Sequence, residues 1–262
     1  MSSGAMCLGL YPEVRQLLAE LLHSITAILG ERFVGMYLYG SLAIGGFDPR
    51  TSDIDFLVVT SGEPSAEELA ALSGMHARLH AHGSHWAQEL EGSYVSTQVI
   101  RRYSPMRTMY LRIDRGESRL VREQLDIDWV IHRHVLHKQG VVLAGPPASE
   151  LIDPVSPAEL RQAQLDLLRT WWVPMIENPS QLHHLGYRCY AIQTMCRALY
   201  TLQFGDVVPK PVACEWAREV LDSRWAPLID WSFILPRIEQ SGNLAETREL
   251  IRHVCEQCIR SH

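Results

Sequence analysis

The chain has 262 residues, 47% of them hydrophobic, and a formal net charge of −6 at pH 7. This length suits one large domain or two modest ones with an ordinary buried core. The acidic balance argues against a protein that follows a nucleic-acid backbone, since such proteins usually present a basic surface. No apolar stretch approaches the roughly 20 residues of a membrane span, and the N-terminus lacks a secretion-signal pattern. We therefore expect a cytoplasmic protein that does not bind membranes, and the charge argues against nucleic acid as its partner.

The cysteines and histidines do not indicate a disulfide framework or a zinc site. Six scattered cysteines are too few for such a framework in a chain this long. Cys255 and Cys258 form a CxxC pair late in a helical pattern, without two further ligands at similar spacing. His76 and His80 are four residues apart on an expected helix, but no HExxH glutamate accompanies them. We interpret the cysteines as ordinary thiols and these histidines as exposed polar positions.

The first half of the chain mixes helices and strands. Apolar residues recur at helical spacing over residues 11–29, and Gly30 is a stop signal. Ser65 and Glu68 have the spacing of a capping box for a helix that reaches about His82. Residues 126–139 are also expected to be helical. Apolar, β-branched and aromatic runs predict strands at Phe33–Tyr39, Ile54–Val59 and Tyr94–Ile100.

The second half of the chain reads as helical. Residues 140–154, GVVLAGPPASELIDP, mix glycine and prolines with a brief apolar run and form the best candidate for a linker. Ser156, Pro157 and Glu159 then provide an N-cap, a first-turn proline and a capping glutamate. Helices are expected at about 157–172, 182–204, 212–221 and 246–260. The prediction is an α+β protein, with a mixed sheet flanked by helices in residues 1–150 and a helical bundle in residues 151–262.

Two aspartates stand at the start of the second expected strand. Asp53 and Asp55 are two residues apart, so their side chains point the same way along a strand. Solvated acids at a strand start are one explanation. A magnesium site is the other, because this hard cation takes one or two carboxylates together with waters and substrate phosphates.

A Gly-Ser turn, separated from Asp53 by eleven residues, favours the metal site. Gly40 and Ser41 lie between an expected strand and a short helical turn. Glycine there lets backbone N–H groups approach a phosphate, and the helix N-terminus stabilises its negative charge. A phosphate-binding turn beside a metal-binding pair predicts a site for a nucleoside triphosphate.

This arrangement resembles the nucleotidyltransferase superfamily with the DNA polymerase β-like fold. The residues that carry the resemblance are the apolar strand, Gly40-Ser41, and the stretch Ser52-Asp53-Ile54-Asp55. The segments VVLAGPPASELIDPVS (141–156) and VPKPVACEWA (208–217) are similar to those of aminoglycoside adenylyltransferases that modify streptomycin and spectinomycin.

The resemblance implies that AMP passes from Mg-ATP to a drug hydroxyl with release of pyrophosphate. Asp53 and Asp55 would hold the magnesium, and Gly40, Ser41 and Ser52 would contact the nucleotide. A glutamate on the neighbouring strand would serve as general base and metal ligand. Glu91 fits this place best, because it directly precedes the Gly-Ser-Tyr start of the expected strand. Glu89 is the alternative if that strand begins early.

The resemblance also implies contacts from the helical half. Arg197 and Lys210 would reach the ATP phosphates. Streptomycin-modifying relatives hold the drug with acidic residues and a tryptophan, but Tyr187 stands where an aspartate is expected and SPMRTMYLRID (104–114) has no tryptophan. Glu177 and Tyr187, with nearby aromatic residues, are the candidates for binding a small cationic, hydroxylated acceptor.

Two further functions are compatible with the motif. A nucleotidyltransferase of the toxin type would modify RNA or a protein, although the acidic charge and long helical half argue against it. A nucleotide-binding protein without turnover would not need both aspartates and Glu91.

Overall fold

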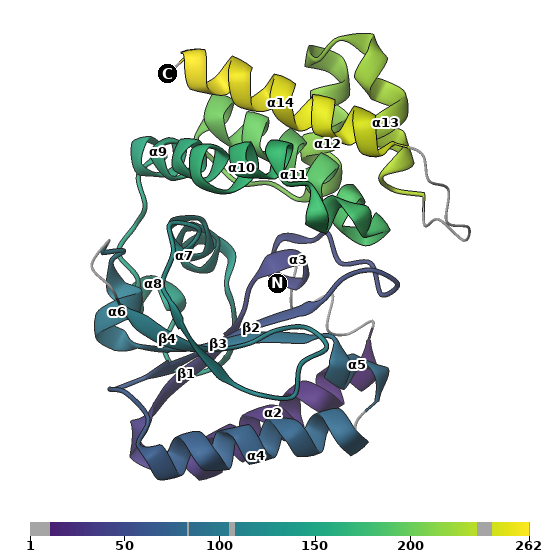
Figure 1. The fold of residues 1–262 in the computed structure, drawn as a ribbon. Coiled ribbons are helices and arrows are strands. Elements are labelled where there is room, and N and C mark those ends of the chain that lie inside the picture. Colours follow the sequence, from purple (N-terminus) through teal and green to yellow (C-terminus); the bar gives the residue numbers. More distant parts are fainter. Residues whose placement is uncertain (1–10, 83, 105–107, 235–242, 262) are drawn as a thin grey trace. The chain divides into compact units, whose positions relative to one another are not determined.

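The computed structural model describes residues 11–82, 84–104, 108–234 and 243–261. The chain divides into two compact units, residues 1–154 and 155–262. The first unit combines a sheet with helices, and the second is helical (Figure 1). The predicted fold class, a mixed sheet flanked by helices and then a helical region, is confirmed.

A single sheet runs through the first unit. Within the described residues it has six strands in the order β5-β4-β3-β2-β1-β6. Only the neighbours β2 and β3 run parallel; the other neighbouring pairs are antiparallel. The strands are β1 Phe33–Leu38, β2 Ile54–Thr60, β3 Leu90–Ser96, β4 Met109–Ile113, β5 Val121–Gln124 and β6 Val141–Ala144.

Helices of the first unit lie on both faces of this sheet, with α2 and α4 together on one face (Figure 1). The core on that face joins Leu21 of α2 and Met75 of α4 to every second residue of the strands, such as Phe56. Because side chains alternate along a strand, the residues between these apolar positions point to the opposite face. The helices are α2 Pro12–Leu29, α3 Gly40–Ile44, α4 Ala66–His82, α5 His85–Gln88, α6 Thr97–Arg101, α7 Trp129–Gln139 and α8 Ala148–Leu151.

The second unit is built around α11, which contacts α9, α12 and α14. A separate apolar core fills this unit, with Ile192 and Met195 of α11 fully buried. Its helices are α9 Pro157–Leu167, α10 Val173–Glu177, α11 Leu185–Phe204, α12 Lys210–Val220, α13 Ala226–Trp231 and α14 Leu244–Ser261. A π-helical turn, Leu168–Trp172, continues α9 into α10.

Both predicted capping boxes are present. The Ser156 hydroxyl accepts from the Glu159 backbone N–H at 3.2 Å, and Glu159 accepts from the Ser156 N–H at 2.9 Å. Likewise, the Ser65 hydroxyl accepts from the Glu68 backbone N–H at 3.2 Å, and the Glu68 carboxylate accepts from the Ser65 N–H at 2.6 Å. These bonds satisfy backbone donors that a helix start leaves unpaired.

The expected third strand was placed too late. β3 covers Leu90–Ser96, and residues 97–101 form α6. The β-branched and aromatic composition of this segment does not mark where the chain leaves the sheet. Ser96 ends the strand with extended backbone and serves as the N-cap of α6.

The prediction of a linker at residues 140–154 was also wrong for most of this segment. Val141–Ala144 form β6, which pairs with β1 at Tyr37↔Val142 and Leu38↔Val141. The Tyr37 hydroxyl donates to the carbonyl of Pro146 at 2.7 Å. This segment is therefore part of the first unit.

The interpretation of His76 as exposed was wrong as well. His76 is only 2% exposed, and its Nε2 lies 2.8 Å from the Tyr94 hydroxyl. Burial lowers the pKa of His76 to about 4, so the ring is neutral near pH 7. His80 is half-buried, with Nε2 3.1 Å from the carbonyl oxygen of Gly116.

None of the helices in the described part of the chain is long and apolar enough to cross a membrane.

Candidate active site

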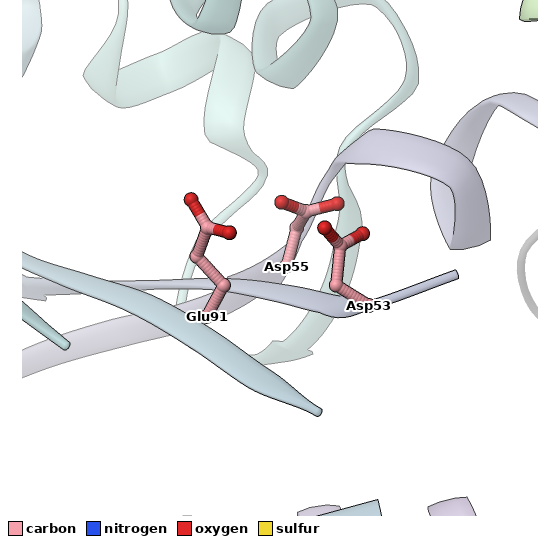
Figure 2. Close-up of side chains that lie close together, drawn as sticks. All are labelled: Asp53, Asp55 and Glu91. Atoms are coloured by element: carbon pink, nitrogen blue, oxygen red, sulfur yellow. The ribbon is translucent and has the colours of Figure 1, made fainter. Parts of the chain in front are cut away.

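Three carboxylates meet on the sheet face opposite α2 and α4. Asp53 directly precedes β2, Asp55 lies within β2, and Glu91 lies on β3. In the parallel register Asp55 is paired with Glu91, which places their side chains on one face. Ligand atoms of the three residues all lie within 4.8 Å of one another. Figure 2 shows the three carboxyl groups projecting from the same side of the strands.

This donor set fits a hard divalent cation. Carboxylate oxygens are ligands that magnesium prefers, and all three residues are half-buried. Burial raises the pKa of Glu91 above its usual value, and the negative charge of Asp53 raises it further. A cation among the three groups would offset their mutual repulsion.

Gly40 makes room for Asp55. Its φ of +56° lies in the left-handed region that side chains avoid. A Cβ atom at this position would lie 1.7 Å from Asp55 Oδ2. The Tyr39 backbone N–H also donates to the Asp55 carbonyl at 3.2 Å, so the turn and the strand are joined at this point. The Gly-Ser turn thus positions one of the three carboxylates.

The serines of the motif have different surroundings. Ser41 Oγ is buried and has no hydrogen-bond partner within the described structure. Ser52 holds the loop before β2: its hydroxyl accepts from the Asp48 N–H at 2.9 Å, and its own N–H donates to the Asp48 carbonyl at 2.8 Å. Ser41 therefore has an unsatisfied hydroxyl within the turn that contacts Asp55 through Gly40, while Ser52 shapes the loop that precedes Asp53.

Glu89 lies apart from this cluster. It follows α5 as the C-cap residue, outside β3, and its carboxylate is ion-paired with Arg115. Arg115 also donates to the Thr51 carbonyl at 3.3 Å. Glu89 and Arg115 thus tie the start of β3 to the loop before Asp53. Of the two glutamates considered from the sequence, Glu91 is the one that joins both aspartates.

Arg112 of β4 lies next to Glu91. Its Nη2 is 3.2 Å from Glu91 Oε1, and its Nη1 is 3.0 Å from Glu123 Oε2 on β5. It is also ion-paired with Asp114. The Arg112 guanidinium lowers the pKa of Glu91, which opposes the effect of burial. Sequence reasoning missed Arg112, although the alternation in MYLRI (109–113) is a strand signal.

A second group of side chains surrounds Tyr39, which the sequence also did not indicate. His132 of α7 packs edge-to-face on Tyr39, with ring centroids 5.2 Å apart. His132 Nε2 lies 3.6 Å from Asp128 Oδ2. Burial raises the pKa of Tyr39 well above its usual value, and the charges of Asp55 and Glu91 add to the effect. The i,i+4 spacing of Asp128 and His132 is the signal that could have drawn attention to them.

Arg197 and Lys210 belong to the second unit. Arg197 is half-buried on α11. Lys210 is the first residue of α12, and its Nζ lies 4.6 Å from the centroid of the Tyr190 ring. A lysine over an aromatic face makes a cation–π contact that orients the ammonium group.

Aromatic side chains gather near Lys210. Tyr187 stacks at an angle on Tyr190, with centroids 5.4 Å apart, and Trp172 lies 6.1 Å from Tyr190. Trp171 Nε1 donates to the Tyr187 hydroxyl at 3.2 Å. Glu177 is exposed at the end of α10. Tyr187 is thus part of an aromatic group with two tryptophans and Tyr190.

Two family models match the chain. Residues 23–99 match a nucleotidyltransferase domain, and residues 150–261 match the C-terminal domain of aminoglycoside adenylyltransferases. The chain thus joins a segment similar to nucleotidyltransferase domains to a segment similar to the C-terminal domain of aminoglycoside adenylyltransferases. The resemblance inferred from the Gly40-Ser41 turn and the paired aspartates is therefore confirmed.

Relatives in this family cover most of the chain. The chain is 29% identical over 227 residues to the aminoglycoside (3'') (9) adenylyltransferase of Shigella flexneri, covering 83% of each chain. It is 26% identical over 224 residues to the spectinomycin 9-adenylyltransferase of Staphylococcus aureus, covering 80% of each.

A solved adenylyltransferase shares the fold. The spectinomycin adenyltransferase from Enterococcus faecialis, crystallised with ATP and spectinomycin, superposes with a TM-score of 0.71 at 16% identity. The match covers 93% of this chain and 98% of that protein. The chain thus shares its fold with that spectinomycin adenyltransferase.

Proposed function

We propose that the chain transfers AMP from Mg-ATP to a hydroxyl group of an aminoglycoside or related aminocyclitol. The observation that carries this proposal is the convergence of Asp53, Asp55 and Glu91 beside the Gly40-Ser41 turn. A nucleotidyltransferase domain requires carboxylates that can hold a metal ion beside a turn that can bind phosphate. The relatives are named for the adenylylation of such drugs.

In this reaction the acceptor oxygen bonds to the α-phosphorus of ATP, while the bond between the α-phosphorus and the oxygen that bridges to the β-phosphate breaks. Pyrophosphate leaves with that electron pair, and Glu91 accepts the proton of the hydroxyl group. Magnesium held by Asp53, Asp55 and Glu91 would supply positive charge for the phosphate oxygens. Removing a general base typically costs about 10²- to 10⁴-fold in rate.

The nucleotide contacts follow from the same arrangement. Gly40, Ser41 and Ser52 would contact the phosphates, with the buried Ser41 hydroxyl as a donor. Arg197 and Lys210 would bind the triphosphate from the second unit. Arginine binds phosphate through a planar fork and lysine through a point charge, so the two residues complement each other.

The acceptor would be a small cationic molecule with sugar or cyclitol hydroxyls. Its charge suits the acidic face formed by Asp53, Asp55 and Glu91. Tyr187, with the aromatic group around it, offers ring faces to cations and sugar rings, and Glu177 adds a negative charge.

The test is direct. Purified protein is incubated with ATP, Mg²⁺ and spectinomycin, streptomycin or kanamycin, and the products are examined by mass spectrometry. We expect an AMP adduct on at least one of these drugs together with stoichiometric pyrophosphate. Pyrophosphate formation without any drug adduct, or no turnover with any of the three drugs, would contradict the proposal.

Variants of the aspartates provide the control. Asp53→Asn and Asp55→Asn should abolish transfer and keep the fold, because each removes a charged ligand and relieves repulsion. Asp166→Asn, at a partly exposed acid of the second unit, should retain the parental rate. Near-normal turnover in either site variant would overturn the metal assignment.

A further inference from the structure

A row of polar side chains crosses four adjacent strands on the sheet face that carries the three carboxylates. Strand pairing places Asp55 beside Glu91, Ser93 opposite Arg112, and Tyr110 opposite Glu123. Alternation along β3 and β4 puts all of these residues on one face. Glu91 and Arg112 are diagonal neighbours across β3 and β4, within reach of long side chains.

Arg112 is anchored from the side away from the aspartates. Glu123 accepts from Arg112 Nη1 at 3.0 Å, and the Tyr110 hydroxyl donates to the same Glu123 oxygen at 3.3 Å. The Tyr110 ring in turn packs edge-to-face on the buried Trp129, with centroids 5.1 Å apart. The guanidinium is therefore held by groups that are themselves fixed to the sheet and to α7.

The other terminal nitrogen of the guanidinium, Nη2, engages both Glu91 and Asp114. Arg112 Nη2 is 3.2 Å from Glu91 Oε1, and both side chains are about 30% exposed, at 30% and 28%. Each Glu91 oxygen can accept more than one hydrogen bond, so this contact orients the carboxylate and leaves capacity for other partners. Because Glu123 holds Nη1 of the same planar guanidinium, the direction of the Nη2 donor toward Glu91 is fixed more firmly than that of a lysine ammonium would be.

We propose that Arg112 is a positioning residue that holds the Glu91 carboxylate in the orientation required for adenylyl transfer. This inference rests on the proposed function. Arg112 acts through Glu91 and belongs to a relay that runs from Glu123 to Glu91 across β5, β4 and β3. An ion pair that only stabilised the sheet would contribute little at this exposure, because solvent screens partly exposed pairs.

The first test compares two arginines of the same sheet. Arg112→Gln should lower kcat about 10²-fold with little change in KM for ATP or acceptor, because a misplacement of about 1 Å has a cost of this size. Arg112→Lys should recover part of the rate. Arg122→Gln is the control, since Arg122 lies on β5 and pairs with the exposed Glu63 at 3.2 Å. It should keep the parental kcat.

The decisive measurement is a double-mutant cycle with Glu91→Gln in single-turnover kinetics. If Arg112 acts through Glu91, Arg112→Gln should cause no further loss in the Glu91→Gln background. Equal losses in both backgrounds, or a folded Arg112→Gln variant within about twofold of the parental rate, would overturn the inference.

If Arg112→Gln melts too early to assay, the cycle is run with Arg112→Lys, and the same two outcomes decide. The parental enzyme reports on the proposed function separately: absence of any adduct there refutes the reaction, whereas normal parental turnover with an insensitive Arg112 refutes only the positioning role.

Discussion

Gly40 and Asp55 are in direct contact, so closely that a Cβ atom on Gly40 would lie 1.7 Å from Asp55 Oδ2. The left-handed conformation of Gly40 and the orientation of a proposed metal ligand are therefore parts of one feature. The Gly-Ser motif is usually explained by access of phosphate to the backbone. In this chain, the absence of a side chain at Gly40 also makes space for the carboxylate.

Gly40→Ala should therefore impair activity beyond the cost of backbone strain. We expect adenylyl transfer to fall about 10²-fold, since Asp55 must move. Gly30→Ala is a matched control, because Gly30 has a similar φ of +50° but no atom within 4 Å of an added Cβ. Gly30→Ala should lose about 1 kcal/mol of stability in thermal unfolding and Gly40→Ala at least as much, and only Gly40→Ala should lose activity. Equal activity in the two variants would refute the steric argument.

Glu91→Gln and Glu89→Gln should separate catalysis from stability. Glu91→Gln should bind ATP nearly normally and lose about 10²- to 10⁴-fold in rate. Glu89 is buried and paired with Arg115, so Glu89→Gln should lower the melting temperature and keep most of the rate. The pair of steady-state and melting measurements checks this assignment, and the reverse pattern would make Glu89 the base.

His76 should make the first unit sensitive to acid. Its pKa is about 4 in the folded protein and about 6.5 when unfolded, so the unfolded state binds more protons between these values. Above pH 6.5 the protonation of His76 does not reduce the free energy of unfolding. As the pH falls from 6.5 towards 4, this free energy decreases by about 3 kcal/mol in total. Urea unfolding at pH 7 and pH 5 measures the effect. His76→Gln, which cannot be protonated, should reduce the difference between the two pH values by about 2 kcal/mol; an unchanged difference would exclude His76 as its source.

Lys210 should be protected by nucleotide. The sequence contains only one other lysine, Lys138 at the end of α7, which provides an internal control. With an amine-reactive reagent, ATP and Mg²⁺ should slow modification of Lys210 and leave that of Lys138 unchanged, as followed by peptide mass mapping. Lys210→Ala should raise the KM for ATP, whereas Lys138→Ala should not. Equal modification of Lys210 with and without ATP would argue against the phosphate contact.

Lys210 should also couple the binding of ATP to the binding of the acceptor. If ATP improves acceptor binding, the acceptor must improve ATP binding by the same factor. Calorimetric titration of a binding drug with and without a non-hydrolysable ATP analogue measures this factor. We expect it to exceed one in the parent and to decrease in Lys210→Ala; a factor of one in the parent would mean that the two ligands bind independently.

Helices and strands whose sequence pattern depends only on neighbouring residues could be predicted from the sequence. The apolar period of α2 and the capping boxes at Ser65 and Ser156 depend on residues close in sequence, and the structure has these elements within about one residue of the predictions. β1 and β2 were found because their apolar residues form continuous runs, as expected for strands buried on both faces.

The strands that were missed depend on their neighbours. VREQ (121–124) has no apolar pattern, and becomes a strand only by pairing with β4 at the edge of the sheet. β6 lies within a glycine- and proline-containing segment that also resembles a linker. Because β4 was not predicted, Arg112 could not be placed beside Glu91. The two aspartates required only local spacing, whereas the surroundings of Glu91 required the strand order.

The position of β6 determines where the chain can be cut. β1 is paired on one edge with β2 and on the other with β6, which comes more than a hundred residues later in the sequence. A fragment that stops at Gly140 would expose the apolar edge of β1, and open edges of this kind promote aggregation. Asp153 further holds Arg102 at 2.8 Å, and its carbonyl accepts from Arg133. A chimaera that exchanges the helical unit for that of a relative must therefore be joined after Pro154, so that the sheet keeps its last strand.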